Sequence, residues 1–147
     1  PPPPPRLNAE QAQQIIGGCA AHAKAKKQSH AIAVTDGGGH LIAFWRMDGN
    51  TAGVGAFSID KAKAVSLWGF PTSRMGAAAD ETPGFASAPG IVTVAGGVPI
   101  YSADGETHLG GVGVSGEAPE DDAACAVAGI EAAGLRAERV RSPTGGR

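Results

Sequence analysis

Short apolar segments separated by glycine-rich turns fill the middle of this chain and limit the folds open to it. The clearest case is the turn Asp36–Gly39, which joins apolar segments at His30–Thr35 and His40–Met47. Apolar and polar residues that alternate beside such a turn are typical of a β-hairpin. The 23 glycines among 147 residues therefore indicate tight turns and close backbone packing in an ordinary globular chain.

Helical spacing, capping residues and turn signals together predict four helices and five strands. The helices are expected at residues 9–27, 51–68, 72–79 and 119–134, and the strands at residues 30–35, 40–47, 91–94, 98–102 and 109–114. Asn8 and Gln11 form a predicted capping box at the first helix, and Asp80–Gly90 is expected to be an irregular loop. Because runs of strands alternate with runs of helices, the expected class is α+β, a five-stranded, mainly antiparallel sheet covered by helices.

Length and charge narrow the class of protein. The 147 residues suit one domain, placed at residues 8–135, after a proline-rich segment at residues 1–7 and before a polar tail at residues 136–147. A net charge of −2 gives no reason to expect nucleic acid or an anionic membrane as a partner. No apolar run approaches the ~20 residues that span a bilayer.

The compartment stays open between cytoplasmic and exported. The first residue is a proline, which loss of an initiator Met or of an export signal would each explain. We lean slightly to the cytoplasmic alternative.

Cys19 and Cys125 lie in predicted helices that are rich in alanine and glycine. Two cysteines do not make a disulfide framework, so both are expected to be small buried residues. A nucleophilic Cys–His pair with His22, one helical turn away, is the alternative. His22 and His30 are otherwise expected at the surface or at helix ends.

A set of motifs resembles the GlcG/HbpS-like haem-binding family. These motifs are Val34–Gly49, Lys61–Ala64, Pro71-Thr72, Gly96–Ile100 and Gly110–Gly116, followed by Asp121 or Asp122. They occur in the family's order and extend over residues 7–134. The resemblance implies a profilin-like sandwich that assembles into homo-oligomers. It also implies haem or tetrapyrrole binding in some members, including the domain appended to PduO-type corrinoid adenosyltransferases.

His108 is the candidate metal ligand, for haem iron. It opens a predicted strand where the family often carries an aliphatic residue, and histidine is a common haem ligand. His40 is first interpreted as part of the family architecture. Arg46 and Asp48 share a strand face, where they are expected to hold an anionic group such as a propionate or to form a structural salt bridge.

Lys61 lies midway along an apolar predicted helix. A partly buried amine there would bind an anion or act as a base, unless it reaches the surface. The glycines Gly96, Gly97 and Gly111 do not precede a helix in a βαβ unit, which excludes a dinucleotide site. They are expected to let backbone or a flat ligand approach closely. The acids at residues 117–122 are expected to be a solvated helix start, with a weak cation site as the alternative.

Three functions follow from these residues. The favoured one is a protein that binds haem or another tetrapyrrole for storage, sensing or handling, with the site between the sheet and the Asp80–Gly90 loop. The second is a cofactor-independent isomerase, hydratase or lyase acting on a small carbonyl or carboxylate metabolite. Its acid–base groups would be Lys61, Asp36, His40 or His108, with glycine amides polarising the carbonyl. The third is an oligomeric accessory protein without chemistry of its own.

Overall fold

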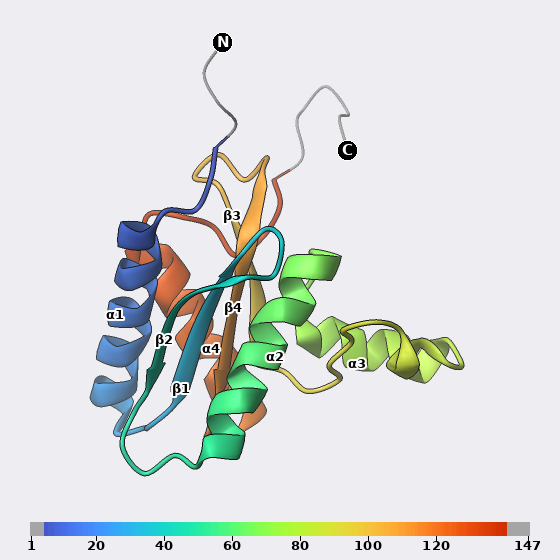
Figure 1. Cartoon of the computed structure of the whole chain (residues 1–147), viewed down its shortest axis with the longest axis horizontal. Helices are drawn as coiled ribbons and strands as arrows, with labels where there is room; N and C mark the ends of the chain where they lie inside the picture. The colour runs from blue at the N-terminus through green and yellow to red at the C-terminus, as the bar shows by residue number, and fades with distance from the viewer. Residues whose placement is uncertain (1–4, 141–147) are drawn as a thin grey trace.

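The computed structural model describes residues 5–140, in which a four-stranded sheet lies between two layers of helices (Figure 1). The order of elements is α1 (Ala9–Lys26), β1 (Ala31–Asp36), β2 (Leu41–Arg46), α2 (Ala52–Trp68), α3 (Thr72–Glu81), the 3₁₀ turn η1 (Phe85–Ser87), β3 (Gly97–Tyr101), β4 (His108–Ser115) and α4 (Pro119–Ala132). Within these residues, no helix is both long and apolar enough to cross a membrane.

The strands lie in the order β2-β1-β4-β3, and every neighbouring pair is antiparallel. The predicted α+β class with an antiparallel sheet is therefore confirmed. The predicted fifth strand at residues 91–94 is wrong, because that segment has no regular secondary structure. Its apolar side chains Ile91 and Val92 pack instead against a small cluster that contains Val65 and Met75.

Helices α1 and α4 lie side by side on one face of the sheet (Figure 1). A Cβ on Gly129 would collide with the carbonyl of Ile15 in α1, so this glycine allows the two helices to touch. A disulfide between Cys19 and Cys125 joins them, with Cα atoms 4.7 Å apart. The predicted burial of both cysteines is confirmed, but the two form a disulfide, which leaves no thiol for a pair with His22.

Helix α2 covers the opposite face and packs closely on β4. A Cβ on Gly111 would collide with the side chain of Val65, and a Cβ on Gly113 with the carbonyl of Ser58. The glycines of β4 therefore bring the backbone of α2 into direct contact with the sheet. The cap of α2 is Thr51, whose hydroxyl accepts a hydrogen bond from the Val54 amide.

Helix α3 and the segment after it project from the sandwich (Figure 1). The helix includes Asp80 and Glu81, so the predicted loop Asp80–Gly90 begins later than expected. Trp68 at the end of α2 anchors the loop that follows α3, because its indole Nε1 donates to the Pro89 carbonyl at 2.7 Å. Its ring also lies edge-on to Phe85, with ring centroids 5.6 Å apart.

The predicted polar tail is partly bound to the sheet. The amide of Tyr101 donates to the carbonyl of Arg136 at 2.7 Å, and the amide of Arg136 donates back at 3.0 Å. The Val140 amide donates a hydrogen bond to the Gly105 carbonyl at 2.7 Å. Residues 136–140 therefore run beside the outer edge of β3, while residues 141–147 lie outside the described part of the chain.

Candidate functional site

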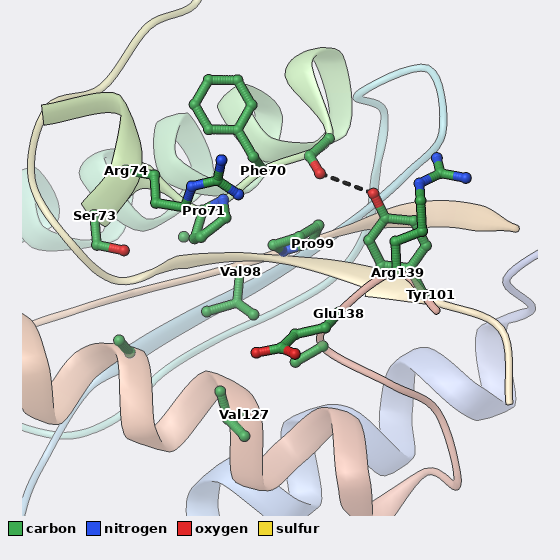
Figure 2. A pocket seen from close by; sticks show the side chains of 14 residues that line it. Phe70, Pro71, Ser73, Arg74, Val98, Pro99, Tyr101, Val127, Glu138 and Arg139 are labelled. Carbon is green, nitrogen blue, oxygen red and sulfur yellow. Dashed lines mark hydrogen bonds between the residues drawn. The ribbon is translucent and has the colours of Figure 1, made fainter. Parts of the chain in front are cut away.

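A cavity of about 660 Å³ opens beside the edge strand β3 (Figure 2). Small-ligand sites commonly measure about 300–1,000 Å³. Four segments form its walls: the start of α3, β3, α4 and residues 137–139. Their principal side chains are Phe70, Pro71, Arg74, Val98, Pro99, Tyr101, Ala123, Val127, Glu138 and Arg139.

Hydrogen bonds at the end of α2 fix the upper wall. Gly69 ends α2 with a φ of 80°, a left-handed conformation that glycine adopts without strain. Its carbonyl accepts a hydrogen bond from the Tyr101 hydroxyl at 2.8 Å, drawn in Figure 2. Thr72 at the start of α3 accepts from the Gly97 amide at 2.9 Å. One hydrogen bond therefore ties the end of α2 to β3, and a second ties the start of α3 to β3.

Three charged side chains line this cavity. The Arg74 guanidinium lies 5.5 Å from the ring centroid of Phe70, and the Arg139 guanidinium lies 5.1 Å from that of Tyr101. Glu138 supplies the third charge. In the part of the chain that the structure describes, neither guanidinium lies within 4.0 Å of a carboxylate. Two cations and one anion give the cavity a net preference for anionic groups.

His108 lies behind one of the cavity-lining side chains. Its ring packs on Tyr101 with centroids 5.1 Å apart, and its Nε2 lies 2.9 Å from the Gly110 carbonyl oxygen. A carbonyl only accepts hydrogen bonds, so Nε2 carries the proton and Nδ1 is free in the neutral ring. Burial lowers the pKa of His108 below its ordinary 6.5, which keeps the ring neutral at pH 7.

The hairpin residues proposed from sequence lie elsewhere. Arg46 ends β2, the edge strand opposite β3, and Asp48 follows it; both side chains are exposed. They do not pair, and Arg46 donates to the Asn50 carbonyl at 2.7 Å. The Asp36 carboxylate accepts from the backbone amides of Gly38 and His40 at 2.9 and 3.0 Å. Asp36 therefore stabilises the turn, and the side chain of His40 is exposed.

Lys61 belongs to a buried polar cluster and not to the cavity. Its side chain is 1% exposed, and its Nζ donates to the Val114 carbonyl at 2.9 Å. It lies 3.6 Å from one oxygen of Asp122, whose other oxygen is 2.8 Å from Nδ1 of His30. Burial lowers the pKa of Lys61, and the nearby charge of Asp122 partly opposes this change.

Two expectations about this cluster are wrong. His30 is fully buried, not at the surface or at a helix end, and Asp122 is 2% exposed, not part of a solvated helix start. Helical spacing could have predicted the burial of Asp122, because this residue lies on the same face of α4 as Cys125 and Gly129. In residues 5–140, no group of three or more His, Cys, Asp or Glu side chains is placed to hold a metal ion.

Gly96 and Gly97 lie where α2 and β4 meet. A Cβ on Gly96, which has a φ of 131°, would lie 2.6 Å from Nζ of Lys61. A Cβ on Gly97 would lie 2.8 Å from the Lys61 carbonyl oxygen and 2.7 Å from the Thr72 methyl group. Both glycines therefore allow close packing around Lys61, and Gly97 also lines the cavity.

The cavity residues that sequence reasoning missed are Arg74, Arg139 and Tyr101. Arg74 follows two residues after the family motif Pro71-Thr72, and this motif was the one nearby sign that the segment could belong to a site. Arg139 lies in the segment interpreted as a polar tail. No local pattern marks either arginine as facing the same space as β3.

The fold and the cavity define a small α+β sandwich with a ligand-sized site on its β3 edge. The chain belongs to the family described as haem degrading protein HbpS-like, whose model matches residues 7–131. The resemblance drawn from the sequence motifs is therefore confirmed.

Curated and solved relatives agree with this assignment. Protein GlcG of Escherichia coli K12 is 35% identical over 111 residues, which cover 74% of this chain and 81% of GlcG. The crystal structure of a PduOC–haem complex matches with a TM-score of 0.83 at 21% identity, covering 92% of this chain and 100% of that one. A double mutant of HbpS from Streptomyces reticuli matches with a TM-score of 0.80 at 24% identity, covering 89% of each chain.

Proposed function

We propose that this protein binds haem or a related tetrapyrrole in the cavity beside β3. The observation that carries the proposal is the lining of that cavity, where the apolar Phe70, Val98 and Val127 share one space with two arginines. A tetrapyrrole has a flat apolar ring that such side chains bury, together with carboxylates that attract guanidinium groups. The haem-related family and the haem complex of PduOC support the same ligand.

The residues present fit this group. The apolar side chains would pack against the macrocycle, and Arg74 and Arg139 would face its carboxylates. His108 is the proposed iron ligand, because it is a neutral histidine next to the cavity. Its ring lies behind the cavity-lining Tyr101, so the Tyr101 side chain would have to swing aside for His108 to reach the iron. When bound, haem would supply an iron centre to which a histidine can bind. We place the protein's role in haem storage, sensing or handling.

A haemin titration followed by the Soret band tests the proposal. Wild-type protein is expected to give a saturable, shifted band. Ala123→Trp fills the cavity from α4 and is expected to weaken haemin binding at least about tenfold. Ala124→Trp is the matched control, because Ala124 is exposed on the same helix and does not line the cavity. A wild-type protein without a saturable shift would refute haem binding, and equal affinities of the two variants would move the site elsewhere.

The iron ligand has its own spectroscopic test. His108→Ala is expected to change the position of the Soret band and the spin state of the bound iron, since the side chain that binds the iron would influence both. His40→Ala serves as the control, because His40 is exposed and outside the cavity. Identical spectra for His108→Ala and wild type would exclude His108 as the ligand.

The enzyme alternative has less support from the described residues. Lys61, Asp36 and His40 do not line the cavity beside β3, and the first two stabilise the fold through hydrogen bonds to the backbone.

We also propose that the chain forms a homo-oligomer. The edge strand β2 exposes the large apolar side chains of Leu41, Phe44 and Trp45, and such an edge favours association. Light scattering after size exclusion is expected to give a multiple of the chain mass. Trp45→Glu is expected to lower that mass, and a monomeric wild type would contradict the proposal.

A further inference from the structure

One wall of the cavity comes from residues 136–140, which follow α4. The paired backbone hydrogen bonds between Tyr101 and Arg136 and the bond from Val140 to Gly105 hold this segment at both ends. Between these fixed points, Ala137, Glu138 and Arg139 line the cavity. The position of Arg139 is therefore set by the sheet and not by a free tail.

The Arg139 side chain is itself held in place. Its guanidinium lies 5.1 Å from the ring centroid of Tyr101, and its Nη1 donates to the Glu106 carbonyl at 3.3 Å. A stacked guanidinium still has further N–H donors in a planar fork, which matches a carboxylate with two parallel hydrogen bonds. Because the group is already ordered, less conformational entropy is lost when an anion binds.

We propose that Arg139 is a specificity-determining residue whose guanidinium binds one carboxylate of the ligand, so that the cavity selects tetrapyrrole acids over their neutral esters. This inference rests on the proposed function and names the part of the ligand that the C-terminal segment recognises. The neighbouring Glu138 also lines the cavity. Its negative charge repels a nearby anion, so this carboxylate is expected beside Arg139 and away from Glu138.

Four affinities and a control test the inference. The probes are iron protoporphyrin IX and its dimethyl ester, titrated at low ionic strength into wild type and Arg139→Gln. Since Arg139 is exposed, its ion pair with the ligand is worth at most about 1 kcal/mol. We therefore expect Arg139→Gln to weaken binding of the acid about fivefold, a factor within that limit, and to leave binding of the ester unchanged.

Arg136→Gln is the matched control. It removes the same charge from the same segment, while the hydrogen bonds of Arg136 with Tyr101 come from its backbone and remain. This variant is expected to bind both probes as wild type does. Equal effects of Arg139→Gln on acid and ester, or no effect on either, would overturn the inference while haem binding stands. Failure of wild-type protein to bind either probe would overturn the proposed function itself.

Discussion

The carboxylate of Asp122 is buried, and its neighbours satisfy both of its oxygens. One oxygen accepts from the Glu117 amide at 3.1 Å and lies 2.8 Å from Nδ1 of His30, while the other faces the Lys61 ammonium. A buried ion pair loses hydration, and it persists where hydrogen bonds satisfy the charged atoms. Among the described residues, Ser115 has the one buried side-chain oxygen or nitrogen without a hydrogen-bond partner.

His108 leads to a prediction for the pH dependence of stability. Its pKa in the folded protein lies below the 6.5 of the unfolded chain, mainly because of burial. As pH falls from 7 through 6.5, the unfolded chain takes up a proton first, so stability decreases until the folded pKa is passed and is constant below it. His108→Gln is expected to reduce this loss in urea titrations at several pH values. An unchanged slope in His108→Gln would contradict the prediction.

At the scale of elements, the contact between α2 and β4 depends on glycine. A Cβ on Gly113 would collide with backbone atoms of Ser58 and Ala62, and backbone cannot rotate away as a side chain can. Gly113→Ala is therefore expected to lower the free energy of unfolding by about 3 kcal/mol or more, the upper end for overpacking. Gly37→Ala is the control, because its Cβ would come no closer than 3.7 Å to the Leu109 carbonyl. Similar urea midpoints for the two variants would contradict this account.

Most elements were predictable because their signals are local. Asn8 marked the start of α1, and the turn after Asp36 marked a hairpin. The segment at residues 91–94 misled because a short apolar run has the same pattern whether it pairs in a sheet or packs beneath a loop. The cavity was not predictable, since the distant residues Arg74 and Arg139 meet only through tertiary packing.

At the scale of the molecule, the Cys19–Cys125 disulfide joins residues 106 positions apart. Closing so long a loop restricts the unfolded chain, which typically stabilises a protein by about 2–4 kcal/mol. The double variant Cys19→Ala/Cys125→Ala is expected to lose that amount in urea unfolding and to be insensitive to reductant. Equal stability of variant and wild type would show that the bond contributes nothing. Such a bond is typical of proteins in oxidising compartments.

The strand order has a consequence for synthesis on the ribosome. Strand β1 lies in the middle of the sheet, yet its partner β4 is translated only after α2, α3 and β3. Until β4 emerges, the edge of β1 that faces away from β2 stays unpaired, and the apolar side chains of Ile32 and Val34 are not yet buried as they are in the finished fold. Unpaired edges of this kind invite aggregation. The nascent chain is therefore exposed to aggregation in the interval between its two hairpins.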